Sequence, residues 1–300
     1  MNGCKKADFL FVIDNSASMA DEQQQLIDSF PAFINTIQNT LAAQDYHIMV
    51  VDTDAANEDG GGSLNCSNGA CTCTPAPGCC ESVCSMGNVS CNGAPCDALP
   101  GGTCDSTLGA GKQFDKDGMV CLPEDGARYI TEEQADLTAT FGCVAAVGID
   151  GSGMEKPMEA MLAAAGPGLN GDGECNAGFV REDAILVVTF ITDEEDAVGQ
   201  SAGDPNSWYA DLVALKAGDP EAVVVLGLIG DNDQPDKICE ELDPMVGTTG
   251  AQAAPRLRSF VSLFGDRGVV GSVCSADYAP FFIDTVDVID LACDEFIPPG

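Results

Sequence analysis

The sequence predicts an α/β protein with a doubly wound, mostly parallel sheet flanked by helices, and with a disulfide-rich insertion. Continuous apolar runs at residues 7–13, 184–191 and 222–229 are typical of strands buried on both faces of a parallel sheet. Stretches with helical spacing of apolar residues alternate with these runs, which favours β-α-β units. Residues 57–125 break the pattern, because they are rich in Gly, Pro, Asn and Ser and contain ten of the 16 cysteines.

The chain opens with a predicted strand–helix–strand unit. Residues 7–13 (ADFLFVI) form the first strand, residues 21–43 a helix and residues 46–51 the second strand. Pro31 lies inside the helical stretch and is expected to kink or split it. The apolar residues of this helix share one face and are Leu26, Ile27, Phe30, Phe33, Ile34, Ile37 and Leu41.

The cysteine-rich segment at residues 57–125 is interpreted as an insertion within a single domain spanning residues 1–300. No aromatic residue occurs between Tyr46 and Phe114, so the segment buries little core and is expected to be held by disulfides. Residues 61–64 are predicted to add a short edge strand. An even number of cysteines suits complete pairing in an oxidising compartment, although the pairing itself stays open. We therefore expect an extracellular, cell-surface or periplasmic location, with any export signal outside these residues.

The elements after the insertion continue the alternation. Pro157 suits the first turn of its helix, because no amide partner is lost there. The order of elements fits an open, doubly wound sheet. The predicted helices cover residues 131–147, 155–165, 205–216, 235–242, 255–264 and 278–292, and the predicted strands cover residues 184–191, 222–229 and 268–273.

The net charge of −36 excludes two classes of partner. A strongly acidic surface repels nucleic acid and anionic membrane surfaces, so neither is expected to bind. No apolar run has the length needed to span a bilayer, so membrane insertion is not expected either. The bulk of the charge is interpreted as a solubilising surface or an adaptation to salt water.

Three predicted loops carry the residues that suggest chemistry. Asp14, Ser16 and Ser18 follow the first strand, residues 193–196 (DEED) follow the strand at 184–192, and residues 148–153 link two helices. Ligands of doubly wound sheets bind outside the carboxyl ends of the strands, where these loops are expected to meet. Carboxylates and hydroxyls without histidine or thiol suit Mg²⁺, Mn²⁺ or Ca²⁺. One carboxylate with two neutral hydroxyls leaves the ion a net positive charge and an open position for an anionic group.

The spacing Asp14-x-Ser16-x-Ser18 after an apolar strand resembles the metal-ion-dependent adhesion site of von Willebrand factor A domains. By this resemblance, Ser152 corresponds to the hydroxyl ligand of the second loop and Asp193 to the aspartate of the third loop. The phrases FVIDNSASM, GSGMEKPMEAM, NAGFVREDAILVV and FITDEED are similar to exported bacterial proteins of this family. The resemblance does not cover the cysteine-rich insertion.

The chain departs from the family pattern at several positions. Glu194 stands where glycine is usual, Ser152 replaces threonine, and Asp150 is a rival for the same role. Asp54 ends the second predicted strand near the same edge, where it can orient ligands or face solvent. Asp14 or Ser18 can also be explained as a cap of the helix at 21–43.

Enzymatic alternatives are less well supported by the residue types. Phosphoryl-transfer sites with an aspartate after the first strand usually want a second carboxylate two residues on, where Ser16 stands, and a lysine after a later strand. His47 is the only histidine and lies inside a predicted strand, so a structural role is expected rather than a Ser-His-Asp arrangement. The acidic turns at residues 115–118 and 170–174 lack the terminal glutamate of a Ca²⁺ loop.

The resemblance implies a metal-ion-dependent binding or adhesion module rather than an enzyme. Asp14, Ser16, Ser18 and Ser152 are expected to bind the ion directly, and Asp193 directly or through water. A protein or glycan ligand that presents a carboxylate would complete the coordination of Mg²⁺. The competing interpretation is a structural or envelope-assembly protein whose metal only stabilises the fold. The ligand's identity and the oligomeric state stay open.

Overall fold

The computed structural model describes residues 5–40, 45–54, 64–73, 87–91, 94–96, 104, 107–117, 119–121, 123, 126–151, 153–242 and 249–298. Within them, six strands form one sheet in the order β10-β9-β8-β1-β2-β7. All neighbours are parallel except β7, which is antiparallel to β2. The strands are β1 (Lys6–Ile13), β2 (Asp45–Asp52), β7 (Ile130–Thr131), β8 (Ile185–Ile191), β9 (Val223–Ile229) and β10 (Gly268–Ser272).

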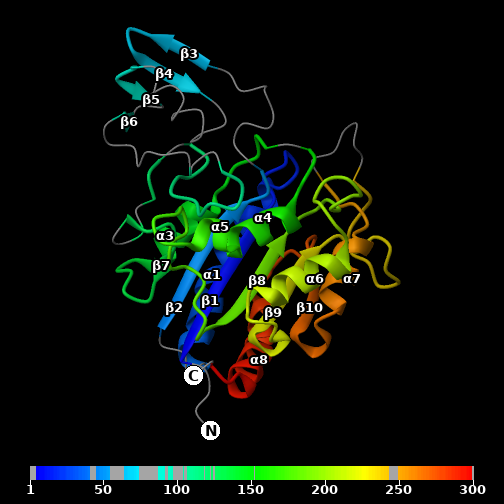
Figure 1. Cartoon of the computed structure of the whole chain (residues 1–300). Helices are drawn as coiled ribbons and strands as arrows, with labels where there is room; N and C mark the ends of the chain where they lie inside the picture. Colours follow the sequence, from blue (N-terminus) through cyan, green and yellow to red (C-terminus); the bar gives the residue numbers. More distant parts are fainter. Residues whose placement is uncertain are drawn as a thin grey trace.

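Helices cover both faces of this sheet, as the sequence predicts (Figure 1). One face packs on α1 (Ala20–Thr40), α3 (Leu137–Ala145) and α8 (Ala279–Glu295), and its core is rich in phenylalanine, with Phe30 and Phe141 stacked at 3.5 Å between ring centroids. The other face packs on α4 (Pro157–Ala165), α6 (Pro205–Ala214) and α7 (Pro255–Ser262). Short helical segments are α5 (Pro167–Asn170), η3 (Pro220–Ala222) and η4 (Gly265–Arg267).

A second, four-stranded sheet belongs to the cysteine-rich segment. It contains β3 (Leu64–Ser67), β4 (Ala70–Cys73), β5 (Ser90–Cys91) and β6 (Ala94–Pro95). Figure 1 shows it beyond the carboxyl ends of the main strands, whereas both termini lie at the opposite end of the molecule. The predicted edge strand at residues 61–64 falls almost entirely outside the described residues. The edge of the main sheet is β7 instead.

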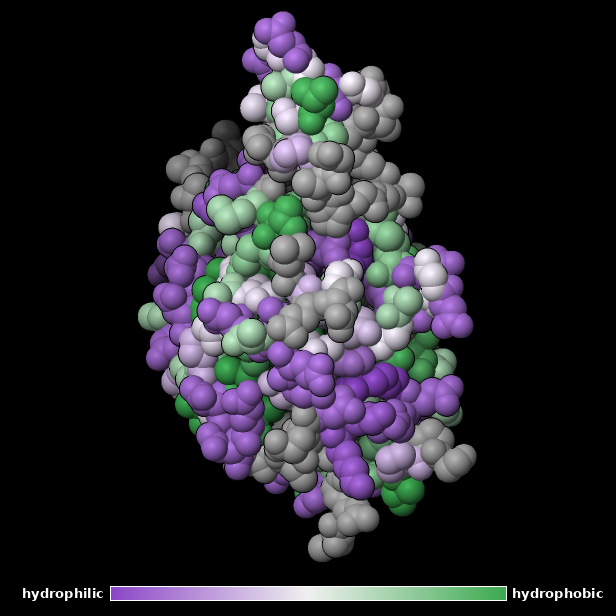
Figure 2. Space-filling view, turned by 90° about the vertical axis from the view of Figure 1, so that its left-hand side faces the viewer, coloured by the Kyte–Doolittle hydropathy of each residue, from purple (hydrophilic) through white to green (hydrophobic). Residues whose placement is uncertain are grey.

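Disulfides tie this segment and the loops together, as predicted. The described bonds are Cys66–Cys71, Cys104–Cys175, Cys121–Cys143 and Cys239–Cys274, and no cysteine of the described part is free. None of the described helices has both the length and the apolar character needed to cross a membrane. On the face that Figure 2 shows, hydrophilic residues cover much of the lower half.

Three predicted elements differ from the structure. The helix predicted at 131–147 begins only at Leu137, because Ile130 and Thr131 pair with β2 as strand β7. Residues 235–242 are not helical: the Asp231 carboxylate instead accepts hydrogen bonds from the amides of Ile238 and Cys239 at 3.0 and 2.8 Å. Pro31 does not split its helix, since α1 runs unbroken from Ala20 to Thr40.

Candidate functional site

The candidate site lies where the strand order of the main sheet reverses. Counted along the chain, its strands run 3-2-1-4-5-6, the order in which ligands bind between the first and fourth strands. These strands are β1 and β8, and Asp14 and Asp193 follow their carboxyl ends. The Asp14 amide donates to the Ile191 carbonyl at 3.0 Å, which fixes the two loops side by side.

Asp14 is fully buried and held from both sides. Its Oδ1 accepts a hydrogen bond from the Ser16 amide at 2.7 Å, and its Oδ2 accepts one from the Thr192 hydroxyl at 2.6 Å. The side chains of Ser16 and Ser18 lie beside it, with their hydroxyl oxygens 3.3 Å apart. The alternating Asp-x-Ser-x-Ser pattern thus turns three oxygen-bearing side chains inward, as the sequence predicts.

The loop at 148–151 is bound to the Asp14 loop. Gln23, in the first turns of α1, donates to the carbonyls of Asp14 and Gly148 at 3.0 and 2.7 Å. The Gly151 amide donates to the Asn15 carbonyl at 2.9 Å, and a Cβ at Gly151 would lie 2.3 Å from the Asn15 Oδ1 atom. A larger residue at 151 would therefore displace the Asn15 side chain. The loop therefore reaches the site as predicted, although Ser152 itself lies outside the described residues.

Asp193 is buried, and no described residue pairs with its charge. It is 1% exposed, and within the described part of the chain neither carboxylate oxygen accepts a hydrogen bond of normal geometry. Burial raises the pKa of Asp193 to about 8, and the charge of Asp14 adds to the rise, which the nearby Ser18 hydroxyl partly offsets. A buried carboxylate with two unused oxygens is costly unless a cation accompanies it.

The acidic run at 193–196 divides into two functions. Glu194 is half-buried, and burial with the charge of Asp14 raises its pKa to about 7. Glu195 instead accepts the amides of Arg256 and Leu257 at the start of α7, at 2.7 and 3.2 Å. Asp196 accepts the Met158 amide in the first turn of α4 at 3.2 Å. Carboxylates satisfy free amides at helix N-termini, so the last two acids hold helices rather than the site.

Glu155 is a site residue that sequence reasoning missed, because it was assigned to the predicted helix at 155–165. It is fully buried, and its Oε2 accepts a hydrogen bond from the Thr53 hydroxyl, while its Oε1 has no hydrogen-bond partner among the described residues. Burial raises the pKa of Glu155 to about 11, and the charges of Asp14, Asp54 and Glu194 add to it. One feature of the sequence could have indicated Glu155: it is an acid in the same short loop as Ser152, directly before the helix that Pro157 begins.

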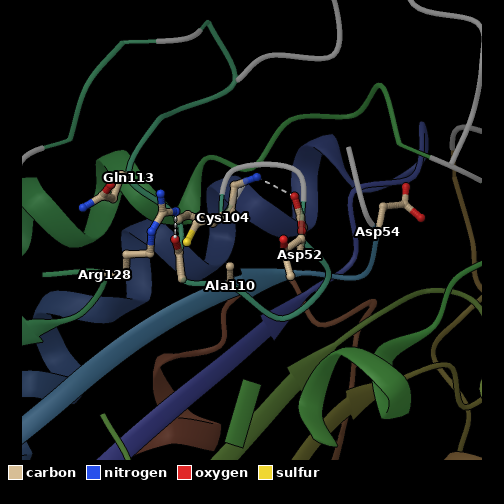
Figure 3. Close-up of a pocket in the computed structure, with 9 residues that line it drawn as sticks. Asp52, Asp54, Cys104, Ala110, Gln113 and Arg128 are labelled. Atoms are coloured by element: carbon tan, nitrogen blue, oxygen red, sulfur yellow. Dashed lines mark hydrogen bonds and ion pairs between the residues drawn. The ribbon is translucent and has the colours of Figure 1, made fainter. Parts of the chain in front are cut away.

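The remaining predicted residues lie at different depths. Asp54 is 6% exposed, and its charge acts on Glu155. Asp150 is exposed to solvent. Asp52, at the end of β2, pairs with Lys112 at 2.5 Å. Figure 3 shows the small polar pocket around this pair and Arg128, whose guanidinium donates to the Gly111 carbonyl at 2.9 Å. These contacts anchor residues 110–113 along β2.

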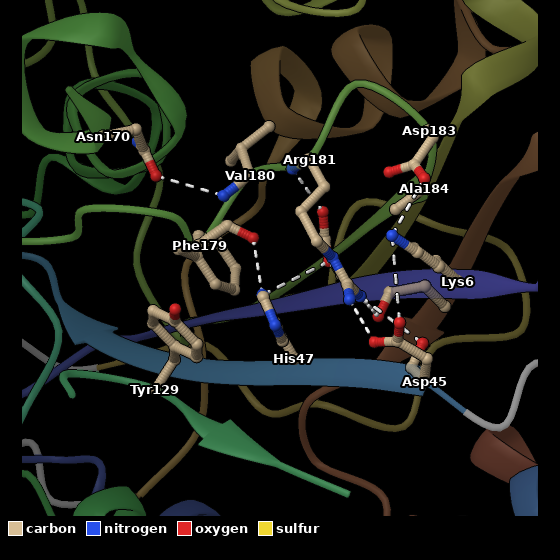
Figure 4. A network of polar contacts seen from close by, with 12 residues as sticks. Lys6, Asp45, His47, Tyr129, Asn170, Phe179, Val180, Arg181, Asp183 and Ala184 are labelled. Carbon is tan, nitrogen blue, oxygen red and sulfur yellow. Dashed lines mark hydrogen bonds and ion pairs between the residues drawn. The ribbon is translucent and has the colours of Figure 1, made fainter. Parts of the chain in front are cut away.

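His47 lies near the start of β2, at the end of the strand opposite to Asp52, and Figure 4 shows the polar contacts around it. Its Nδ1 atom is 3.0 Å from the Phe179 carbonyl, and its ring packs on Tyr129 at 4.3 Å. Beside it, Arg181 binds the buried Asp8 carboxylate, with its Nε atom 2.8 Å from Oδ1. The predicted position of His47 inside a strand is confirmed, and this histidine does not reach the candidate site.

The donor set suits a hard divalent cation. No lysine or arginine of the described chain is among the main charges acting on Asp14, Glu155 or Asp193. Among the described residues, no three His, Cys, Asp or Glu side chains converge closely enough to hold a metal by themselves. The hydroxyls of Ser16 and Ser18 would therefore complete the coordination, and hydroxyl and carboxylate oxygens are the ligands that Mg²⁺ and Ca²⁺ prefer.

Three exposed apolar side chains belong to the two loops beside Asp14. Ile149, Met154 and Val198 are 41%, 62% and 85% exposed.

Comparisons with known proteins give little beyond this geometry. No protein-family model and no curated protein matches the sequence. Among solved structures, proximal thread matrix protein 1 from the mussel byssus is similar, with a TM-score of 0.45 and 12% sequence identity. The match covers 97% of this chain and 50% of that one, so this chain spans about half the length of the mussel protein. A likeness this distant gives no information about ligand or metal.

Proposed function

We propose that the chain is a von Willebrand factor A-like module that binds an external ligand through a divalent cation. The carrying observation is the convergence of Asp14, Ser16, Ser18 and an unpartnered, buried Asp193 at the reversal of strand order. In this proposal the protein is not an enzyme. The sixteen cysteines and the described disulfides support a location outside the cytosol, at the cell surface, in the periplasm or in the extracellular medium.

The proposed ion ligands are carboxylates and hydroxyls from three loops. Asp14, with Ser16 and Ser18, would hold the ion directly, Ser152 would approach from the neighbouring loop, and Asp193 would act directly or through water. Mg²⁺ is the proposed ion, with Mn²⁺ and Ca²⁺ as chemically similar occupants. The bound ion would supply a coordination position for an oxygen of a protein or glycan ligand. The exposed side chains of Ile149, Met154 and Val198, in the loops beside Asp14, would add contact area.

A second function is favoured by one observation. Asp14, Ser16, Ser18 and Asp193 are 0%, 3%, 7% and 1% exposed, so an ion between them would have little contact with solvent. Such an ion would stabilise the fold by binding only the folded state, and the protein would then serve a structural or envelope-assembly role.

Thermal unfolding with EDTA, Mg²⁺ and Ca²⁺ tests the metal site in the wild type, in Asp14→Ala and in Asp150→Ala. At a hundredfold excess over Kd, the ion is expected to stabilise the wild type by about 2.7 kcal/mol, or about 5 °C in Tm. Asp14→Ala should lose this shift, whereas the exposed Asp150→Ala should keep it. The metal-site hypothesis fails if EDTA leaves the Tm of the wild type unchanged and Asp14→Ala responds to the added ion as the wild type does.

Ligand capture separates the two functions. Immobilised metal-loaded protein is exposed to panels of glycans and extracellular matrix proteins, with Asp14→Ala and EDTA as controls. Retention that EDTA abolishes supports the binding module. Metal stabilisation without any EDTA-sensitive retention supports the structural role.

A further inference from the structure

The inference concerns Glu155, which neither the sequence pattern nor the family resemblance assigns to the site. We propose that Glu155 is a direct ligand of the bound cation, and that the site therefore accepts a neutral oxygen, such as a hydroxyl or an amide carbonyl, rather than a carboxylate. This rests on the proposed function, since it presupposes the ion. It replaces the carboxylate ligand that the spacing of Asp14, Ser16 and Ser18 suggests.

The position of Glu155 is set by three neighbours. It ends the loop that Gly151 fixes to Asn15, and it directly precedes α4, whose first turn Asp196 caps. Thr53, which follows β2, donates to the Glu155 Oε2 atom and also lies 3.2 Å from the Asn15 Oδ1 atom. One hydroxyl thus connects the Glu155 carboxyl group to the loop that carries Asp14.

One oxygen of Glu155 remains for a ligand. Oε1 is buried without a hydrogen bond from any residue that the structure describes, and Glu155 as a whole is 0% exposed. Asp14 is the strongest charge that acts on Glu155, and the Thr53 hydroxyl joins Glu155 to Asn15, the residue after Asp14. Two neighbouring acids inside a protein repel one another when both are charged, and a cation between them removes that repulsion.

The charge of the site decides what the open position accepts. Asp14 and Glu155 together neutralise a divalent ion, and Asp193 and Asp54 add negative charge around it. An anionic ligand would meet a net negative centre in a chain of net charge −36. A glycan hydroxyl or peptide carbonyl coordinates without adding charge, as the serine hydroxyls do.

Manganese binding to the full chain tests both parts, with water-proton relaxation reporting Kd and the access of water to the ion. Glu155→Gln keeps the shape and the contact with Thr53 but removes the charge, and it is expected to weaken Mn²⁺ binding at least about tenfold. Glu159→Gln, one turn further along α4, is the matched control and should bind as the wild type does. Glu155→Asp retains a carboxylate, and circular dichroism checks the fold of each variant.

Acetate serves as the carboxylate probe. In the wild type, acetate should leave the water-proton relaxation caused by bound Mn²⁺ unchanged. In Glu155→Gln, acetate should displace water from the ion and lower this relaxation. Equal Mn²⁺ affinity in Glu155→Gln and the wild type would overturn Glu155 as a ligand while the metal site stands. Acetate binding to the wild-type ion would overturn the preference for neutral oxygen. Absence of any Mn²⁺ binding to the wild type would instead refute the proposed function itself.

Discussion

The hydroxyl of Thr192 provides a sharp test of how the site is built. Thr192 is fully buried, and its Oγ1 atom donates to the Asp14 Oδ2 atom at 2.6 Å. The same oxygen accepts a hydrogen bond from the Glu194 amide at 3.0 Å. Thr192→Val retains the shape of the side chain and removes only this hydroxyl. The substitution therefore isolates the support that β8 gives to the loop after β1.

The expected effect follows from these two contacts. Losing a hydrogen bond to a charged group and leaving the partly buried Glu194 amide unsatisfied should together destabilise the protein by about 2–4 kcal/mol. A residue that orients a metal ligand typically affects metal affinity by about 10–100-fold. Such a change corresponds to about 1.4–2.8 kcal/mol of binding free energy.

Urea unfolding and Mg²⁺ titration of Thr192→Val measure both quantities. Thr189→Val is the matched control, because Thr189 is equally buried in β8 but lies about 10 Å further from the carboxyl end. Thr189→Val should leave Mg²⁺ affinity unchanged. If Thr192→Val binds Mg²⁺ as tightly as this control does, the Thr192 hydroxyl does not position Asp14 for metal binding.

Two further predictions concern the fold that supports the site. Arg181→Met removes the guanidinium that pairs with the buried Asp8 carboxylate and should destabilise the protein by about 3–5 kcal/mol at neutral pH, measured by urea unfolding. Burial raises the pKa of Asp8 to about 6 even beside Arg181. The protonated form of Asp8 therefore favours the fold below pH 4, and this contribution is lost as the pH rises through 6. The loss of unfolding free energy in Arg181→Met should accordingly be smaller at pH 4 than at pH 8. An equal loss at both pH values would contradict the claim that Arg181 acts by compensating the charge of Asp8. Gly151→Ala places a methyl group against Asn15, so we expect about 1–3 kcal/mol of destabilisation and weaker Mg²⁺ binding. Wild-type melting and metal affinity in this variant would show that the two loops are not tightly joined.

The sequence was sufficient for the parts of the fold that repeat a simple pattern. The buried strands β1, β8 and β9 are apolar runs, and the single stripe of α1 predicts its packing face. Pro31 was misleading, because a continuous apolar face outweighs one missing hydrogen bond inside a long helix. The stretch at 235–242 was misleading in the opposite sense, since the Asp231 carboxylate and the Cys239–Cys274 disulfide fix a non-helical path.

The candidate site was predictable only where it follows a strand. Asp14 and Asp193 were found because parallel strands bring their carboxyl ends to one edge. Glu155 reaches the site through a loop whose path depends on Gly151 and Thr53, and no periodicity reports such a path. The sequence did not predict the different roles of Glu194 and Glu195 either. Glu195 binds the start of α7, which lies about sixty residues away along the chain.

The central claim is that Asp14 and its neighbours hold a divalent cation. Isothermal titration of Mg²⁺ into chelator-treated protein, wild type against Asp14→Ala, measures this directly on the full chain. The account predicts one ion per chain for the wild type and loss of that binding in Asp14→Ala, with Asp150→Ala unchanged. A wild type that binds no ion, or an Asp14→Ala variant that binds as the wild type does, would contradict it.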